Sequence, residues 1–424
     1  MNADLTIFFL VIVIYALIAG RLDRWLITMP IFFVVAGALL GDLLPGFTPA
    51  IRGTTTLTEI TLALLLFADA TTISFTRFMH DNGLPERLLF VGLPASMLLG
   101  GLAAWALFPQ EGVWFALLLA AILTPTDAAL GLAIFNNEKV PTRVRRALNV
   151  ESGLNDGMVT PFVALFLAMV VATDEGALEP FLRPALAEIG IAVVVAAVVG
   201  TLGGRLFDLA QTRKWTTPSI IQIGGLALAL TAYFGSVSLG GNGFIAAFVA
   251  GLLFGRVVKQ RAHHIVEFTE TSGTLLSLLV WTLFGSFVPQ IIRDFEPRAL
   301  LFALFALTLM RMPAVALALR GSGLRRDTVA LMGWFGPRGL ASVVFTLIAL
   351  EEYERLGLHP NVLVAAAGWT VLLSVVLHGV SAQPLANWYA RRLQSAPPDS
   401  PEFADASELT IRRSSLAHGA TSAD

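Results

Sequence analysis

The chain has 424 residues, a formal net charge of −2, no cysteine and a mean hydropathy of +0.75. Hydrophobic residues make up 56% of it and charged residues only 14%, far below the roughly 25% charged residues of soluble domains. This composition excludes a soluble globular domain and predicts a membrane protein. The absence of cysteine excludes disulfides and thiolate metal sites.

Apolar stretches follow one another along the chain, with short polar breaks between them. A bilayer core of roughly 30 Å requires about 20 apolar residues per helix. The sequence therefore predicts an all-α polytopic membrane protein with thirteen transmembrane helices, at residues 5–20, 27–44, 55–76, 88–108, 113–135, 147–173, 185–209, 217–234, 237–255, 272–290, 299–319, 328–350 and 361–383. The first stretch lacks a basic n-region and a cleavage site, so we expect a retained helix and not a signal peptide.

Basic residues are sorted between alternate loops. Of the 28 Lys and Arg residues, 19 fall in one set of alternate loops and five in the other. Cytoplasmic loops carry the excess of Lys and Arg, so the pattern predicts a periplasmic N-terminus and a cytoplasmic C-terminus. Residues 1–394 are the predicted transmembrane domain. Residues 395–424, rich in Ser, Ala, Pro and Asp, are predicted to be a disordered cytoplasmic tail.

Ionisable residues inside spans cost roughly 2.5–3.5 kcal/mol each on insertion scales, so each needs a reason to be there. The most central are Asp69, Asp127, Glu151, Asp156, Arg311 and Arg338. For any one of them, a structural ion pair between helices is an equally good interpretation. Four acids against two bases, however, leave at least one carboxylate that must be protonated, hold a cation, or alternate between the two.

The fifth and twelfth spans each contain a helix-breaking segment. The fifth carries Thr124-Pro125-Thr126-Asp127, and the twelfth carries the Gly- and Pro-rich stretch 333–339, which includes Arg338. Each break alone is typical of an ordinary proline kink. Matched breaks in halves of opposite orientation instead indicate an inverted-repeat transporter site, where Asp127 and Arg338 would offset the partial charges of half-helix ends.

The sixth span presents two polar faces. Ser152 and Asp156 are four residues apart and share one face, offering a hydroxyl and a carboxylate to a hard cation. Glu151 and Asn155 share a second face, about 100° away, which suits contact with a neighbouring helix.

These segments resemble the monovalent cation/proton antiporter superfamily, in its NhaP-type sodium/proton exchanger branch, over residues 5–385. The segment 151–156 is similar to the family's Glu-Ser-x-x-Asn-Asp motif, and Thr126-Asp127 to its Thr-Asp pair. The stretches 310–313 and 336–339 resemble the surroundings of the family's two membrane arginines. Asp69 resembles its acidic site on the third helix, where many members have the longer Glu.

The resemblance implies inverted repeats with two discontinuous crossing helices. It also implies core helices at about 88–173 and 299–383, with the remaining helices largely forming the interface domain of a homodimer. The implied function is secondary antiport of Na⁺ or Li⁺ for H⁺ across the inner membrane, in sodium transport and pH homeostasis. Monovalent cations, protons and the bilayer are the implied partners, and no cofactor or nucleic acid is expected.

By the same likeness, Asp156 would bind the ion or the proton, and Ser152 and Thr126 would supply further oxygens to Na⁺. Asp69 would approach through water. The remaining motif residues would support this site: Glu151 would pair with Arg311 more readily than with Arg338, and Asn155 would tie down the break of the fifth span. An Asn at position 155, instead of Asp, is similar to electroneutral exchangers that move one cation per proton.

Other functions remain open at this point. A potassium/proton antiporter of the same fold is compatible with every motif. A cation channel would need a continuous polar pore or a carbonyl filter, and the polar residues converge on one depth instead. An enzyme would need a nucleophile–base pair or metal ligands, and none is recognisable. His263 and His264 fit a solvated loop better than a pH sensor, and His378 lies toward the cytoplasmic end of the last span.

Overall fold

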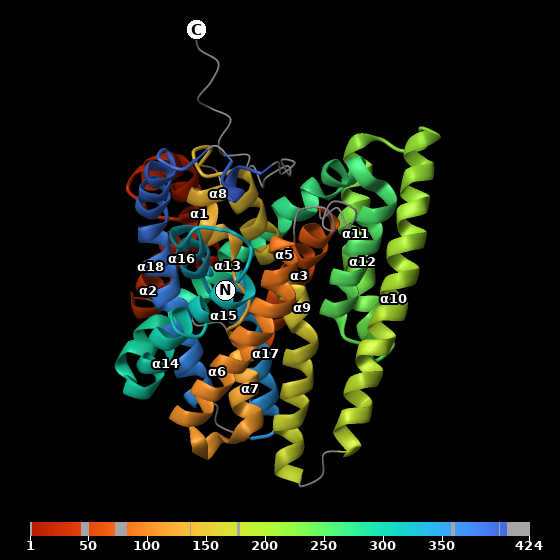
Figure 1. The fold of residues 1–424 in the computed structure, drawn as a ribbon. Coiled ribbons are helices and arrows are strands. Elements are labelled where there is room, and N and C mark those ends of the chain that lie inside the picture. Colours follow the sequence, from red (N-terminus) through yellow and green to blue (C-terminus); the bar gives the residue numbers. More distant parts are fainter. Residues whose placement is uncertain are drawn as a thin grey trace.

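The computed structural model describes residues 2–43, 51–72, 83–135, 137–175, 179–357, 361–397 and 399–404, and within these ranges the regular secondary structure is entirely helical (Figure 1). The α-helices are α1 (Asn2–Arg24), α2 (Met29–Leu43), α3 (Ile51–Thr72), α5 (Leu84–Arg87), α6 (Leu93–Leu107), α7 (Gly112–Ile122), α8 (Leu132–Phe135), α9 (Thr142–Glu175), α10 (Glu179–Thr212), α11 (Pro218–Ser238), α12 (Gly243–Val258), α13 (Ala262–Arg293), α14 (Pro297–Leu307), α15 (Met312–Ala318), α16 (Arg326–Trp334), α17 (Leu340–Arg355) and α18 (Asn361–Leu393). Short 3-10 or π turns join some of them: η1 (Leu88–Gly92), η2 (Pro109–Glu111), η3 (Ala128–Gly131), η4 (Lys259–Arg261) and η5 (Pro401–Phe403).

Every predicted span overlaps a helix or an interrupted helix of this fold. Among the described residues, seven helical segments are long and apolar enough to cross a bilayer, and four further apolar helices are shorter. The all-helical polytopic architecture is therefore confirmed, whereas the number of thirteen crossings stays a prediction.

Three of the predicted spans are interrupted. The breaks between α7 and η3 and between α16 and α17 lie where the sequence predicts them. A third interruption, for which the sequence analysis gave no prediction, separates α14 from α15 within the predicted span 299–319. Pro313 explains the restart, because it occupies the first turn of α15, where its missing N–H is not needed.

One group of helices consists of α2, α3, α10, α11, α12 and α13, which pack side by side. α12 and α3 approach closely where Gly251 and Gly255 face the backbone of Phe67 and Thr71. A Cβ on either glycine would lie 2.5 or 2.2 Å from a carbonyl oxygen of α3. This small-residue pair, one turn apart, allows the two backbones to touch.

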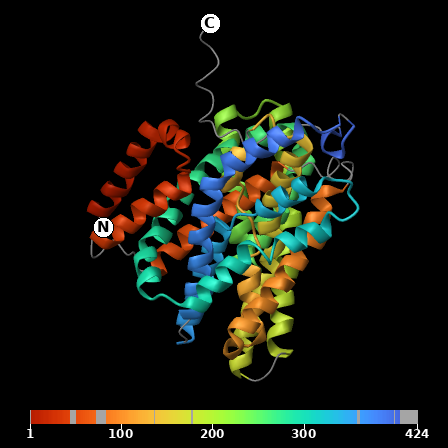
Figure 2. The same ribbon diagram turned by 60° about the vertical axis from the view of Figure 1, so that its left-hand side comes forward.

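The second group consists of α6, α7, α9 and α14 to α18. In Figure 1, α9 stands between α7 of this group and α10 of the first group, and α17 contacts both α3 and α18. Figure 2 shows α1 and α2 as the outer flank of the molecule, with α2 packed on α13. The interrupted helices all belong to the second group, so the breaks lie inside one packed unit.

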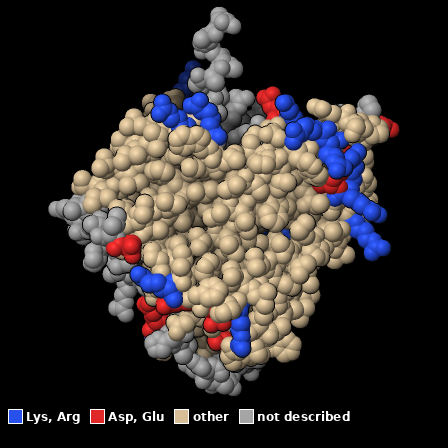
Figure 3. Space-filling view, turned by 90° about the vertical axis from the view of Figure 1, so that its left-hand side faces the viewer, with Lys and Arg blue, Asp and Glu red and all other residues tan. Residues whose placement is uncertain are grey.

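The surface is layered by charge. Figure 3 shows a broad, almost uncharged band between charged side chains near the top of the view and others near the bottom. Large apolar side chains on the outer helices are open to the surroundings; Leu17 on α1 is 79% exposed and Val194 on α10 is 64% exposed. Such a surface is compatible with lipid and not with water.

The start of the predicted disordered tail is folded. Residues 399–404 follow α18 and include η5, and Glu402 within it is fully buried. Its carboxylate accepts hydrogen bonds from the Arg325 N–H and the Thr328 hydroxyl, each at 2.8 Å. The predicted disorder is therefore wrong for this stretch, because one buried acid anchors it; residues 405–424 lie outside the described residues.

Candidate functional site

The two predicted breaks lie against each other at the centre of the second group. The Asp127 N–H donates to the Pro337 carbonyl at 2.8 Å, which joins the two broken segments through their backbones. The Asp127 carboxylate then accepts from the N–H of Ala129 at 2.7 Å and from the N–H of Leu340 at 3.0 Å. It therefore caps the start of η3 and the start of α17, where helix N–H groups otherwise lack partners.

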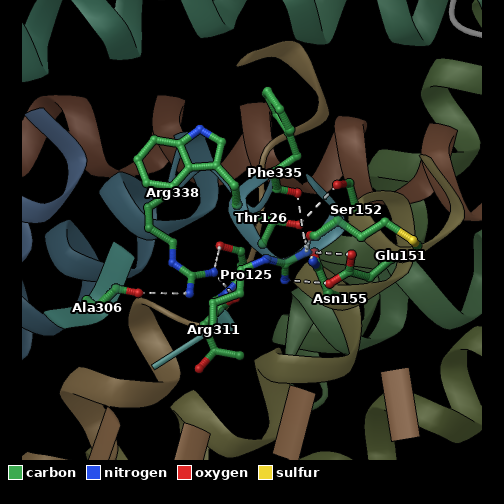
Figure 4. A network of polar contacts seen from close by, with 12 residues as sticks. Pro125, Thr126, Glu151, Ser152, Asn155, Ala306, Arg311, Phe335 and Arg338 are labelled. Carbon is green, nitrogen blue, oxygen red and sulfur yellow. Dashed lines mark hydrogen bonds and ion pairs between the residues drawn. The ribbon is translucent and has the colours of Figure 1, made fainter. Parts of the chain in front are cut away.

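Arg338 donates to free carbonyl groups, whereas Asp127 accepts from free N–H groups. Its side chain is fully buried, and its guanidinium donates to the carbonyls of Thr124 at 2.6 Å and Pro125 at 3.3 Å, just after α7 ends (Figure 4). A positive charge at the carboxyl end of a helix is favourable because the last carbonyls carry partial negative charge. Arg338 and Asp127 thus complement the half-helix ends, as the sequence suggested.

Glu151 and Arg311 form a buried, two-bond ion pair. The guanidinium donates to both carboxylate oxygens, at 2.7 and 2.8 Å, and both side chains are at most 5% exposed. Arg311 also donates to the Phe335 carbonyl at 3.3 Å, at the end of α16. The expected partner of Glu151 is the one found, and the pair joins α9 to two of the interrupted helices.

Two glycines in the break of the twelfth span leave room for these charged groups. A Cβ on Gly336 would lie 1.8 Å from the Arg311 Nε, and a Cβ on Gly339 would lie 2.1 Å from an Asp127 carboxylate oxygen. Any larger residue at either position would displace a charged side chain that is already hydrogen-bonded.

Three polar side chains meet beside this crossing. The Asn155 amide donates to the Thr126 hydroxyl at 2.6 Å, and the Thr126 and Ser152 hydroxyls lie 3.0 Å apart (Figure 4). All three are buried. The sequence placed Thr126 and Ser152 at one ion site and Asn155 at the break; the structure brings all three into one network.

Asp156 lies one helical turn from Ser152, on the wall of a cavity of about 860 Å³. Ser152, Thr126, Asp69 and Asp127 line the same cavity. From this buried end the cavity reaches exposed residues of the loops predicted to be cytoplasmic, which include Glu138, Lys139 and His263. The site is therefore open to one side of the protein.

The engaged groups define what this site can do. Glu151 is committed to Arg311, and both oxygens of Asp127 accept backbone N–H groups. Asp156 and Asp69 line the cavity together with the hydroxyl-bearing residues Ser152 and Thr126. These four side chains form an oxygen-rich surface, which is the chemistry that hard cations prefer.

Several polar residues near the site were given no role by the sequence analysis, which named only His378 among them and placed it toward the cytoplasmic end of the last span. Ser374 and His378 on α18 contact the break of the twelfth span, and Gln383 and Asn387 on the same helix line the cavity. The signal was the spacing of Ser374 and His378, four residues apart within an apolar span. His263 lines the cavity mouth and His264 lies 3.7 Å from Glu267. All three are exposed as expected, but they lie in the first turns of α13 and not in the predicted loop.

Comparison with known proteins gives concordant matches. The family model described as "Sodium/hydrogen exchanger, transmembrane" matches residues 7–388. The K⁺/H⁺ antiporter NhaP of Alkalimonas amylolytica is 26% identical over 401 residues, which are 90% of this chain and 65% of that protein. The Na⁺/H⁺ antiporter NhaP of Pseudomonas aeruginosa is 26% identical over 370 residues, 80% of this chain and 81% of that one.

A solved structure shares the fold. The sodium proton antiporter MjNhaP1 of Methanocaldococcus jannaschii superposes with a TM-score of 0.73 at 20% sequence identity, covering 92% of this chain and 99% of that one. The likeness therefore extends over nearly the whole membrane part.

Proposed function

The chain belongs to the sodium/hydrogen exchanger family of transmembrane proteins, and on this premise we propose that it is a secondary antiporter that exchanges Na⁺ or Li⁺ for H⁺. The observation that carries the proposal is the position of Asp156, at the buried end of a cavity that is open to one side and beside the Ser152 and Thr126 hydroxyls.

Competition for one carboxylate supplies the coupling. A carboxylate in a partly buried site is more stable with a proton or a cation bound than as an isolated charge, and Asp156 would bind the two alternately. Ser152 and Thr126 offer oxygens that replace part of the water around Na⁺, and Asp69, which lines the same cavity, adds charge through intervening water. Antiport follows if only the loaded protein changes the side to which the site opens.

The neighbours of Asp156 support exchange of one cation per proton. Asn155 is a neutral amide bound to Thr126, so it adds no second titratable charge beside Asp156. Glu151 and Asp127 are already engaged in the crossing. One positive charge then binds in either half of the cycle, and the loaded site has the same charge with Na⁺ as with H⁺.

The larger arrangement follows from the same proposal. The core would comprise residues 88–173 and 299–383, which hold the crossing and Asp156, and the other helices would form the interface of a homodimer. The protein would lie in the inner membrane with its N-terminus periplasmic and its C-terminus cytoplasmic. The cavity, whose mouth is lined by the predicted cytoplasmic loops, would then represent the inward-open state.

Ion flux in proteoliposomes tests the function. The purified protein is reconstituted with an acidic lumen and a pH-sensitive dye, and NaCl, LiCl or KCl is added outside. We expect Na⁺ and Li⁺ to dissipate the proton gradient, to the same extent with and without a clamped membrane potential. A response to K⁺ alone would move the substrate to potassium, as in the named relative from Alkalimonas.

The Asp156→Asn variant is the matched control, because it keeps the size of the side chain and removes its charge. We expect no exchange from this variant at normal expression and with an unchanged melting temperature. Exchange at the wild-type rate would refute Asp156 as the carrier, and absence of exchange by wild type with every cation would refute the antiporter itself.

A further inference from the structure

His378 is fully buried and contacts the end of α16. Its Nε2 lies 2.9 Å from the Trp334 carbonyl oxygen. A carbonyl can only accept, so Nε2 must carry the hydrogen of this bond. Trp334 is the last residue of α16, and its carbonyl lies where the helix leaves its final acceptors without intrahelical donors.

The other ring nitrogen reaches the far end of the same break. Nδ1 lies 3.2 Å from the Ser374 hydroxyl and 3.1 Å from the Ser374 backbone carbonyl oxygen, and the hydroxyl accepts from the Arg338 backbone N–H at 2.6 Å. In a neutral ring with its hydrogen on Nε2, Nδ1 can only accept, so its hydrogen-bond partner is the Ser374 O–H and not the carbonyl. Three hydrogen bonds then run in sequence, from the N–H of Arg338 through Ser374 and His378 to the carbonyl of Trp334.

We propose that His378, acting with Ser374, is a positioning residue for the ion site. The two side chains fasten both ends of the broken segment 334–338 to one turn of α18. That segment in turn holds the other break, since Arg338 donates to the Thr124 and Pro125 carbonyls and Pro337 accepts from Asp127. Thr126 lies between these bonded residues. The series of three hydrogen bonds, called the relay below, therefore holds in place an ion-site oxygen that His378 does not contact.

A packing role is the competing explanation. The imidazole lies against the Trp334 indole, with ring centroids 4.9 Å apart and planes inclined by 31°. Filling that space requires a side chain of similar size but no hydrogen bonds. His378→Leu therefore keeps much of the volume and removes both bonds, whereas His378→Gln places an amide N–H at the distance of Nε2 and keeps a donor toward Trp334.

The first test does not depend on transport. Amide hydrogen exchange is measured by mass spectrometry on the detergent-solubilised protein, in peptides that cover residues 333–340. We expect faster exchange in this segment for His378→Leu and Ser374→Ala, with partial recovery of protection in His378→Gln. Unchanged protection in all variants would refute the relay. The control is Thr370→Val, because Thr370 is equally buried on α18 but bonds only to Ala366 of its own helix.

The second test rests on the proposed exchange function and measures the apparent KM for Na⁺ in proteoliposomes. We expect His378→Leu and Ser374→Ala to raise KM about fivefold, the ratio for one net hydrogen bond, with maximal rate changed less than twofold. His378→Gln should fall between these variants and wild type, and Thr370→Val should match wild type.

Energetic coupling decides between a relay and two separate contacts. If the bonds act in sequence, the double variant His378→Leu/Ser374→Ala should raise KM no more than either single variant. Additive effects of the two substitutions on KM would overturn the proposal. It would also be overturned if wild type exchanges Na⁺ and both single variants have KM values within twofold of wild type. If wild type itself fails to exchange, the antiporter assignment falls, and the hydrogen-exchange result alone decides on the relay.

Discussion

The two buried arginines differ in what balances their charge. Arg311 has a carboxylate partner, whereas Arg338 is surrounded by carbonyl oxygens at the end of α7. A buried ion pair contributes little over an apolar pair of the same size, but losing one partner strands the other. Glu151 therefore acts in the fold by keeping Arg311 neutralised between α9 and α16.

The Glu151→Ala substitution should lower the stability of the folded protein. Removing one member of a buried pair costs about 3–5 kcal/mol, so we expect a clearly lower melting temperature in detergent and less folded protein in the membrane. The double variant Glu151→Leu/Arg311→Met removes both charges and should recover part of the loss. A melting temperature equal to wild type in Glu151→Ala would contradict this account.

Much of the site could be predicted at the residue scale. Charges inside apolar spans are costly, so Asp127, Glu151, Asp156, Arg311 and Arg338 stand out from the sequence alone. Their pairing could not be derived from spacing, because it depends on which breaks meet in space. The sequence assigned no role to Ser374 or His378, because neither carries an obligatory charge and their contacts are with backbone groups that a sequence does not display.

At the scale of elements, the start of α16 depends on residues far along the chain. Glu402 accepts from the Arg325 N–H at the first turn of this helix and from the Thr328 hydroxyl, which also bonds to the Tyr389 hydroxyl on α18. Arg143 of α9 donates to the Pro401 carbonyl. The segment 399–404 thus ties together the same ends of α9, α16 and α18.

Truncation should separate this anchored segment from the rest of the tail. A chain that ends at residue 397 loses Glu402, so we expect a melting temperature several degrees lower than that of full-length protein. A chain that ends at residue 404 keeps every contact described above and serves as the control. Equal melting temperatures for the two truncations would show that Glu402 does not stabilise the fold.

Asp327 gives the start of α16 a pH dependence. The hydrogen bond from Arg325 holds the pKa of Asp327 below its usual value. A depressed carboxyl pKa stabilises the folded protein above the ordinary value of about 4, and the stabilisation is lost as pH falls through the lower, folded value. Asp327→Asn should therefore lower the melting temperature modestly at pH 7, by a gap that narrows below about pH 4. A constant gap across this range would contradict the assignment.

The breaks show what element prediction can achieve. The breaks of the fifth and twelfth spans can be predicted, because each has Pro or Gly beside a charged residue. The break between α14 and α15 has only Pro313, and a proline near the middle of an apolar stretch is equally compatible with a kinked continuous helix. The interruption depends on tertiary contacts that the sequence does not show, because Arg311, which lies between α14 and α15, pairs with Glu151.

For the whole molecule, the composition and the distribution of Lys and Arg predicted an all-helical polytopic membrane protein. How the helices group together could be seen only in the structure. Which helices pack together depends on contacts between residues distant in sequence, such as Gly251 and Gly255 against α3. The predicted orientation of the chain rests on the Lys and Arg bias between loops.

The orientation is testable by single cysteines, since the natural chain has none. Glu111→Cys in η2 and Arg213→Cys after α10 place thiols on exposed residues of opposite predicted sides. In intact inner-membrane vesicles of known sidedness, a membrane-impermeant maleimide should label only the residue facing outward. With the periplasmic face outward, that residue should be Glu111→Cys; labelling of the Arg213→Cys protein alone would invert the topology.

The one-sided cavity also bears on how voltage acts on the protein. A cavity that reaches the surface and fills with water would bring the electrical potential at Asp156 close to that of the adjacent solution. The membrane voltage would then fall mainly across the layer of protein on the other side of the site. A short displacement of that layer past Asp156 would transfer the bound ion from one potential to the other, without carrying it through the thickness of the bilayer.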